Sequence, residues 1–509
     1  MKVWIRLLGL LLVMTMGLCL FASCKKDPEK PKNNTTNNED DEKLPYEKDY
    51  GIDFGGRTFT ICNATNDSAG YGSANLYIEG PSDAGQDTDA VEYRTFQRNA
   101  WVEKNLNMVF EYIHVDVGYA EVVNTLTPYL MSESDIDLYI NKLYPMVNLS
   151  LNGHFANIAN RPELQYFENY WYNDYMNEMS LDDGNTAYIL AGDYFMDIIQ
   201  SSWIMLCNTT MLNEVYQDKG GSDAFIQAVF DGNWTYEQLS TLIADAYYDI
   251  DGDGTVNDGD RMGLAVDQYW GNLIPMVVSS NLKYIEKDGE TWKYALYNDD
   301  SLKLFDSLNA IFFNKGTTPM RKSSNPYVYD SMFATESLPY FTNKNALFTT
   351  GHFGTMKQIV ASETDMEWTV LPFPKLRAEQ SYLTPTHDTT EIGAIPRTTS
   401  NLSEVLQLLE VLSDQAHLRI MPEYYDKMLK SRYSKNPTVA KMVDLIHDTM
   451  GGSFVLGYSN YCGDNFVWKP FYEPLYNGQS FTSNYRSIEG GANGYIETLL
   501  TTWKKIRPQ

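Results

Sequence analysis

The chain has 509 residues, of which 43% are hydrophobic and 14% aromatic, a content that suffices for a large core divided between two lobes. It carries 67 acidic and 39 basic residues, and the formal net charge of −28 argues against nucleic acid or an anionic lipid surface as its ligand, because both attract basic proteins. The motifs of P-loop, Rossmann, zinc-protease and α/β-hydrolase enzymes are absent, so we expect no catalytic residue and no enzyme, although a glycosidase, whose two carboxylates need no fixed motif, stays an alternative.

The N-terminus has the pattern of an export signal. Two basic residues precede an apolar run over residues 7–21, and the sequence Ala-Ser-Cys24 follows it. The run is too short for a mature membrane span, and small residues at its end are typical of a cleavage site. A Cys at that point resembles the lipobox of bacterial lipoproteins, so we expect a lipoprotein signal peptide over 1–23 and lipidation of Cys24. An ordinary secretory signal with an incidental Cys is the alternative.

Residues 24–49 follow the expected lipid anchor. They are rich in Lys, Asn, Asp and Glu and almost free of large apolar side chains, so they cannot bury enough surface to fold. We expect a disordered tether that holds the rest of the chain away from a membrane. The expected location is the cell membrane, lipid-anchored, on the extracellular or periplasmic side.

Strands and helices alternate in the next segment. Residues 57–62, 108–115 and 135–141 have the apolar, β-branched pattern of strands, and the segments between them have the pattern of helices. This βαβαβ order predicts a parallel sheet with right-handed crossovers. Ligands of such sheets collect beyond the carboxyl ends of the strands, which here are the loops after Cys62 and Asn141.

Three cysteines remain beside those of the export signal. Cys62, Cys207 and Cys462 lie far apart and form no C-x-x-C pair, which argues against redox or zinc chemistry. We expect buried free thiols, with one disulfide as the alternative.

An acidic loop over 249–260, "DIDGDGTVNDGD", follows a predicted helix that starts with a capping box at Thr235 and Gln238. Its oxygen-bearing residues have the spacing of a twelve-residue calcium loop, with Gly254 at the sharp turn. The candidate metal ligands are Asp249, Asp251, Asp253, Thr255, Asn257 and Asp260. A single loop without a paired partner favours a structural Ca²⁺ over a sensor. A solvated acidic turn is the alternative.

Four later segments carry a resemblance to a known family. They are "GNWTYEQLSTLIADA" (232–246), "NALFTTGHFGTMKQI" (345–359), "MEWTVLPFPK" (366–375) and "EIGAIPRTTSNLSEVLQLLEVLS" (391–413). In this order they resemble the extracellular solute-binding proteins of bacterial carbohydrate ABC transporters, family 1, the maltose-binding-like proteins. The likeness covers nearly everything after Tyr50.

The resemblance implies an α/β, two-lobed periplasmic-binding-protein-like fold of type II, with mixed sheets flanked by helices and a hinge between the lobes. The order of the segments assigns residues 50–160 and 368–413 to lobe 1. Residues 161–367, which contain the acidic loop, and 414–509 are then expected in lobe 2.

The resemblance also implies a function. It predicts a lipid-anchored receptor that binds a carbohydrate between its lobes and delivers it to the transmembrane subunits of an ABC permease. The expected carbohydrate is an oligosaccharide. We expect a monomer that contacts the membrane through its lipid alone and binds no nucleic acid. Neutral sugars present apolar ring faces and hydroxyl groups, so aromatic platforms with polar neighbours are expected. The candidates are Tyr269, Trp270, His352, Phe353, Phe466 and Trp468, with Lys142, Tyr144, Asp67 and Tyr71 on the strand-end loops.

A different binding protein is the alternative function. A surface glycan-binding lipoprotein built on a helical-repeat scaffold, serving an outer-membrane transporter, would also carry a lipidated Cys and exposed aromatic residues. It would be mostly helical with little sheet, whereas the first hypothesis requires two mixed α/β lobes.

Overall fold

The computed structural model describes residues 47–507 apart from 64–74, 85–87, 119, 133–134, 183, 268, 290, 323–328, 334–335, 433–436, 453 and 468, and at a few further positions the backbone alone. The chain divides into two compact units, Met1–Lys48 and Asp49–Gln509, and the architecture given below is that of the second. The expected signal peptide, Cys24 and nearly all of the tether lie outside the described residues. Among the helices that are described, none has the length and apolar character needed to cross a membrane.

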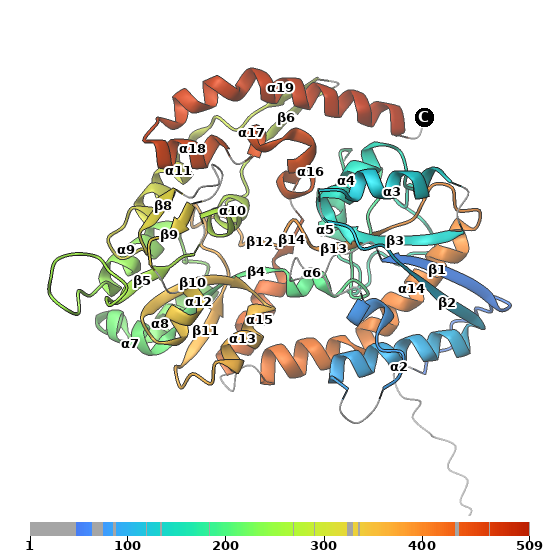
Figure 1. The fold of residues 1–509 in the computed structure, drawn as a ribbon, viewed down its shortest axis with the longest axis horizontal. Coiled ribbons are helices and arrows are strands. Elements are labelled where there is room, and N and C mark those ends of the chain that lie inside the picture. Colours follow the sequence, from blue (N-terminus) through green and yellow to red (C-terminus); the bar gives the residue numbers. More distant parts are fainter. Residues whose placement is uncertain are drawn as a thin grey trace, which may run out of the picture. The chain divides into compact units, whose positions relative to one another are not determined.

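The first sheet has four strands in the order β13-β3-β1-β2 (Figure 1). The strands are β1 (Arg57–Asn63), β2 (Met108–His114), β3 (Ile136–Lys142) and β13 (Glu391–Ala394). Strand β1 pairs in parallel with β2 and β3, which confirms the predicted parallel order, and β13 is antiparallel to β3. All seven residues of β3 are buried, as expected for an inner strand of a sheet covered on both faces. The helices that follow these strands are α2 (Ala90–Asn105), α3 (Val122–Met131) and α4 (Leu143–Leu151).

The second sheet also has four strands, in the order β11-β4-β10-β5. They are β4 (Trp203–Asn208), β5 (Met262–Ala265), β10 (Ala346–His352) and β11 (Trp368–Leu371). Strand β10 is parallel to β5, whereas β4 is antiparallel to β10 and β11, so this sheet is mixed. Around it lie α7 (Thr209–Val215), α8 (Gly221–Phe230), α9 (Tyr236–Ala246), α12 (Ser337–Thr342) and α13 (Thr355–Ala361). Helix α9 starts as predicted: the Thr235 side chain accepts a hydrogen bond from the Gln238 amide.

Two segments lie in other lobes than we expected. Strand β11 was expected in lobe 1, but its backbone pairs with β4 of the second sheet. Conversely, the segment around Leu190 was expected in lobe 2, but Leu190 and Gly393 exchange backbone hydrogen bonds at the edge of the first sheet. Both differences have the same cause. The free N–H and C=O groups at a sheet edge can form hydrogen bonds with any strand that lies beside them, and the order of segments along the chain does not determine which strand that is.

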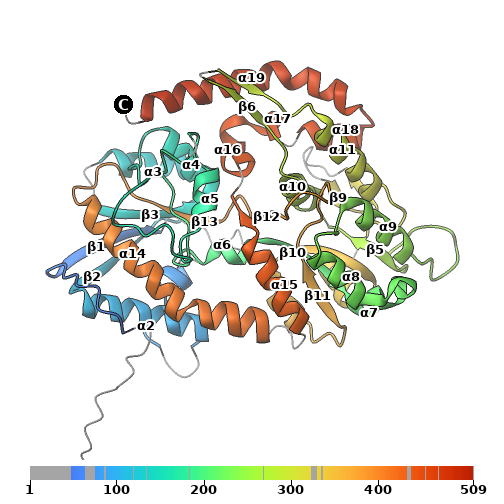
Figure 2. The same ribbon diagram turned by 180° about the vertical axis from the view of Figure 1, so that it is seen from behind.

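The C-terminal part of the chain contacts both lobes instead of belonging to lobe 2. Helix α14 (Leu402–Arg419), most of which was expected in lobe 1, packs beside α2 of that lobe, as Figure 2 shows from behind, while α15 (Pro437–Asp448) packs against β11. The longest described helix, α19 (Phe481–Ile506), contacts β7 (Thr291–Tyr294) at one part of its length and α4 at another. These helices therefore tie the two sheets together in addition to the chain crossings between them.

The remaining elements mostly have fewer than ten residues. They are η2 (Asn75–Glu79), α5 (Asn173–Glu178), α6 (Asp197–Gln200), η3 (Gln217–Lys219), α10 (Tyr269–Ser279), β6 (Ile285–Asp288), α11 (Asp299–Phe312), β8 (Met320–Lys322), β9 (Tyr329–Ser331), β12 (Thr384–Pro385), η4 (Pro422–Arg432), β14 (Met450–Gly451), α16 (Phe454–Cys462), α17 (Asp464–Val467) and α18 (Lys469–Asn477). Cys62, Cys207 and Cys462 are buried and free, which confirms the expectation of free thiols.

Candidate functional site

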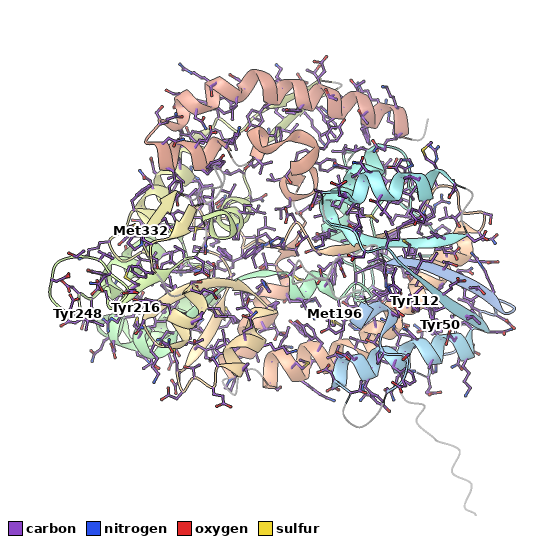
Figure 3. The ribbon with its side chains drawn as sticks, in the orientation of Figure 1. Tyr50, Tyr112, Met196, Tyr216, Tyr248 and Met332 are labelled. Atoms are coloured by element: carbon purple, nitrogen blue, oxygen red, sulfur yellow. The ribbon has the colours of Figure 1, made fainter. Side chains whose placement is uncertain are left out.

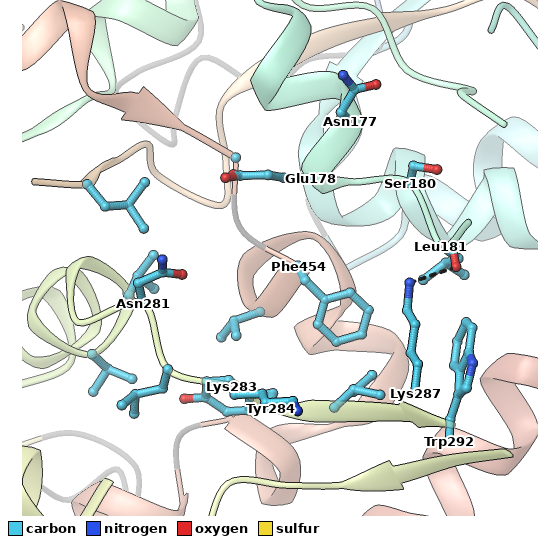
Figure 4. Close-up of a pocket in the computed structure, with 17 residues that line it drawn as sticks. Asn177, Glu178, Ser180, Leu181, Asn281, Lys283, Tyr284, Lys287, Trp292 and Phe454 are labelled. Carbon is cyan, nitrogen blue, oxygen red and sulfur yellow. Dashed lines mark hydrogen bonds between the residues drawn. The ribbon is translucent and has the colours of Figure 1, made fainter. Parts of the chain in front are cut away.

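A cavity of about 340 Å³ lies where elements of both lobes meet, and we call it the interlobe cavity. Helix α5, in the segment attached to the first sheet, supplies one wall, and the end of α10 with the following residues 281–287 supplies the opposite wall. Phe454 at the start of α16 lies between the two walls (Figure 4). The volume falls in the range of small-molecule sites, about 300–1,000 Å³.

The lining combines flat apolar groups with hydrogen-bonding groups. Aromatic side chains come from three elements: Tyr284, Trp292 and Phe454. The polar side chains are Asn177, Glu178, Ser180, Asn281, Lys283 and Lys287. Such a lining suits a ligand that carries both hydroxyl groups and apolar faces, because each kind of surface finds a partner of its own kind.

Glu178 is the carboxylate of this cavity. Burial, together with the nearby charge of Asp174, raises the pKa of Glu178 to about 7. Near neutral pH the side chain is therefore close to an equal mixture of its acid and its anion. The protonated acid donates a hydrogen bond, whereas the anion only accepts. Glu178 can therefore bind a hydroxyl group that acts either as acceptor or as donor.

Lys287 and Trp292 form a fixed corner of the cavity (Figure 4). The Lys287 ammonium donates to the carbonyl oxygen of Leu181 at 3.0 Å, a bond that joins the β6–β7 hairpin to the opposite wall. It also lies 5.2 Å from the centroid of the Trp292 ring, within the range of cation–π attraction. Trp292 in turn stacks on Trp503 of α19, with centroids 5.9 Å apart. This packing restricts the rotation of the Trp292 ring.

Two of the predicted aromatic platforms are fully buried. Phe353 and Phe466 have no exposed surface, so neither ring offers a face to a ligand here; both fill the apolar core. Phe466 lies behind the cavity lining, with its ring centroid 5.8 Å from that of Tyr284. His352 is also buried, and burial together with the nearby His387 lowers its pKa to about 4, which keeps the ring neutral.

Lys142 and Tyr144 were expected on a loop, but Lys142 ends β3 and Tyr144 lies in the first turn of α4. Both are buried, and neither lines the interlobe cavity. Helix α10 starts with Tyr269 and Trp270, whose side chains lie outside the described residues, while its other end lines the cavity. Trp468, Asp67 and Tyr71 also lie outside the described residues, so their roles stay predictions.

The sequence analysis missed the residues that do line the cavity. They come from segments near 180, 280–292 and 454, which are separated by long stretches of chain, and no motif connects them. A usable signal was Gly289, which has positive φ and follows Asp288 in the turn between β6 and β7; the pairing of Asp288 with Thr291 places Lys287 and Trp292 opposite each other.

The acidic loop brings its first carboxylates together. Asp249, Asp251 and Asp253 each have a carboxylate oxygen within 4.8 Å of the others. Asp249 accepts hydrogen bonds from the amides of Gly252 and Gly254 at 2.7 and 2.9 Å, and the Gly254 bond is the main cause that lowers the pKa of Asp249. Both glycines have positive φ, which the tight turn requires.

Asp260 ties the two ends of the loop. It is fully buried, and its carboxylate accepts from the amides of Ile250 and Asn257, both at 3.1 Å. Asp260 is not in the group of converging carboxylates, which consists of Asp249, Asp251 and Asp253. Oxygen atoms of this kind are the ligands that hard cations such as Ca²⁺ prefer. Tyr248, beside the loop, lies at the outer end of its lobe, well away from Met196 between the sheets (Figure 3).

No protein-family model and no curated protein sequence matches the chain. Its backbone is similar to solved structures of solute-binding proteins. The galacto-N-biose-/lacto-N-biose I-binding protein of the ABC transporter from Bifidobacterium longum, in complex with lacto-N-biose, has a TM-score of 0.54 and 10% identity, over 88% of this chain and 98% of that chain. UspC from M. tuberculosis has a TM-score of 0.53 and 13% identity, over 86% of this chain and 100% of that chain.

An ABC substrate-binding protein from Listeria monocytogenes, in complex with cycloalternan, has a TM-score of 0.50 and 10% identity, over 87% of this chain and 99% of that chain. At these identities the structural similarity shows the fold alone. The chain has the two-lobed, mixed α/β fold of these proteins, so the predicted fold class is confirmed. The two mixed sheets also contradict the helical-repeat alternative.

Proposed function

We propose that the chain is a receptor that binds a carbohydrate in the interlobe cavity and delivers it to an ABC permease. The observation that carries this proposal is a cavity lined from both lobes by aromatic rings and hydrogen-bonding groups. It occurs in a fold that is shared with proteins solved in complex with lacto-N-biose and cycloalternan. Those fold neighbours are transport receptors and not enzymes, and we infer that this chain likewise makes and breaks no bond.

Recognition of a sugar would use both kinds of lining. The rings of Trp292 and Phe454 offer the apolar surface that their contacts within the protein leave open, while Asn177, Glu178 and Asn281 offer donors and acceptors for hydroxyl groups. Because these residues stand on opposite walls, a ligand that contacts both walls stabilises the closed arrangement of the lobes. The permease would then distinguish the loaded receptor from the empty one by the closed arrangement.

A glycan panel read by thermal unfolding tests the proposal. A bound glycan raises the unfolding temperature by mass action, and the increase grows with glycan concentration. Asn281→Ala, which removes one polar group from the cavity, should reduce the shift. Asn309→Ala, an exposed asparagine on α11, should not. If amino acids or peptides shift the melt and no glycan does, the proposed substrate class is wrong.

We also infer that Cys24 is lipidated and holds the receptor on the outer face of the cell membrane through the tether. The export pattern before Cys24 and the composition of 24–49 support this inference. Mass spectrometry of the N-terminal peptide tests it. A diacylglyceryl adduct on Cys24 is expected, and Cys24→Ser should leave the protein unlipidated. An unmodified Cys24 in the membrane fraction would contradict the inference.

A structural Ca²⁺ in the acidic loop is a third inference. The three convergent carboxylates would repel each other without a cation, and the side chains present are the hard oxygen donors that Ca²⁺ prefers. Calorimetric titration of CaCl₂ into chelator-treated protein should give one binding event. The absence of heat in the wild type would refute the site.

A further inference from the structure

A second hollow, of about 570 Å³, lies next to the interlobe cavity, and we call it the flank hollow. It is open to solvent on the side of the molecule formed by the β6–β7 hairpin and the first half of α19. Lys283 lines both spaces, the interlobe cavity and the flank hollow. The two spaces are therefore adjacent at Lys283, whose side chain is 60% exposed.

The flank hollow contains a stack of tyrosine rings. Tyr485 of α19 lies parallel to Tyr294 of β7, with centroids 5.4 Å apart, and Tyr297 lies 5.1 Å from Tyr485. Tyr297 is the outermost ring and is 42% exposed. Its hydroxyl group pairs with that of Thr482 at 3.1 Å. Tyr297 also stacks on Phe481, with ring centroids 6.4 Å apart. These ring contacts and the hydrogen bond hold Tyr297 in place, so the part of the side chain that stays exposed is preorganised for an apolar partner.

The charged residues of the flank hollow balance each other. Two cations, Lys283 and Arg486, stand with two anions, Glu286 and Glu489. Lys283 and Glu286 form an ion pair of 3.2 Å in which both side chains are 60% exposed. Exposed pairs of this kind are weak, so ligand hydroxyl groups can replace them at little cost. A balanced set of donors and acceptors beside an aromatic ring favours a neutral polyhydroxylated ligand over an anion or a cation.

We propose that the flank hollow is an outer subsite for a linear, neutral oligosaccharide whose other end occupies the interlobe cavity. This inference rests on the proposed function and narrows its substrate class, because a monosaccharide or disaccharide bound in the cavity would leave the flank hollow empty. Tyr297 would stack on a sugar ring, and Arg486 would donate to its hydroxyl groups.

The test measures affinity against chain length. Ladders of linear α-glucan, β-glucan, xylan and mannan oligosaccharides, from disaccharide to octasaccharide, are titrated by calorimetry into the wild type, Tyr297→Ala and Arg486→Ala. Tyr129→Ala is the matched control, because Tyr129 is 40% exposed and lines neither space. Tyr297→Ala could disturb folding, so Arg486→Ala provides a second, independent test. Arg486 is exposed, and its substitution leaves the tyrosine stack intact.

In the ladder that binds, affinity should rise with length in the wild type and in Tyr129→Ala. Tyr297→Ala should weaken the long oligosaccharides by about tenfold, the factor that corresponds to one aromatic contact, and leave the disaccharide unchanged. An equal length dependence in all the proteins, or none in the wild type, would overturn the outer subsite while leaving the receptor function standing. If no oligosaccharide in any ladder binds, the proposed function itself fails, and the subsite with it.

Discussion

The interlobe cavity and the acidic loop shift the pKa of a carboxyl group in opposite directions. In the cavity, desolvation raises the pKa of Glu178, a residue that keeps contact with solvent, to about 7, so near neutral pH the folded protein holds both the acid and the anion. In the loop, hydrogen bonds from backbone amides, that of Gly254 above all, lower the pKa of the half-buried Asp249, so the folded protein favours the anion. Desolvation dominates in the first region and hydrogen bonding in the second. A carboxyl group that is only partly ionised at neutral pH suits an uncharged ligand, whereas several carboxylates held close together favour a cation.

Removal of calcium from the loop has the largest expected effect on stability. With Ca²⁺ at about a hundred times its dissociation constant, binding adds about 3 kcal/mol to the free energy of unfolding. Chelation by EGTA should therefore lower the midpoint of urea unfolding in the wild type. Asp251→Asn should weaken this response, because one of the three convergent carboxylates loses its charge.

The matched control is Asp306→Asn, which removes an exposed carboxylate on α11 of the same lobe, outside the loop. This variant should keep the full response to EGTA. If chelation leaves the midpoint of the wild type unchanged, the loop is a solvated turn and the contrast with the cavity is lost.

Trp292→Ala should have the next largest effect, on ligand binding. The substitution removes an aromatic face from the cavity and the ring under the Lys287 ammonium. We expect the glycan that shifts the wild-type melt to bind roughly tenfold to a hundredfold more weakly, or about 1.4–2.8 kcal/mol. Calorimetry measures the affinity. Trp101→Ala, a half-buried tryptophan on α2 of the first lobe, should leave the affinity intact, and equal losses in both variants would contradict the assignment.

Glu178 should make stability depend on pH in the direction set by its raised pKa. Below about pH 4.5 the acid is protonated in both states, and between 4.5 and 7 only the folded protein keeps the proton. The contribution of Glu178 is therefore present at low pH and is lost as pH rises through about 7. After allowance for solvent screening the loss is on the order of 1–2 kcal/mol.

Urea unfolding at intervals from pH 4.5 to pH 8 measures this loss. Glu178→Gln should flatten the profile, because the amide does not titrate. Glu497→Gln, an exposed position on α19, should retain the wild-type slope. A wild-type slope that persists in Glu178→Gln would assign the dependence to another group.

The sequence predicted those features whose residues are close together along the chain. The parallel pairing of β1 with β2 and β3 followed from three apolar runs and the helices between them. The acidic loop was recognisable because its six candidate ligands lie within twelve successive residues, and the structure brings three of them together. In both cases local spacing determines the geometry.

The interlobe cavity could not be predicted in this way. Glu178, Lys283 and Phe454 become neighbours only when both lobes have formed, and no local pattern expresses that proximity. Phe353 illustrates the opposite error. An aromatic side chain at the end of a strand is apolar whether it fills the core or faces a cleft, and the structure has it fully buried. The lobe of β11 was misassigned because its partner, β4, lies far away in the sequence.

The hydrogen bond from Lys287 to the Leu181 carbonyl provides the smallest of these tests, and it concerns the contact between the two walls of the cavity. Lys287→Met keeps the apolar stem over Trp292 but removes the donor. One hydrogen bond at this exposed position contributes about 0.5–1 kcal/mol, so affinity should fall about two- to fivefold. X-ray scattering of the ligand-free protein should also show a larger radius of gyration, because one contact between the walls is lost. Lys293→Met changes an exposed lysine on the other strand of the same hairpin and should alter neither value. If affinity and radius of gyration change equally in both variants, the positive charge of the hairpin is the cause. The hydrogen bond from Lys287 to Leu181 then does not hold the two walls together.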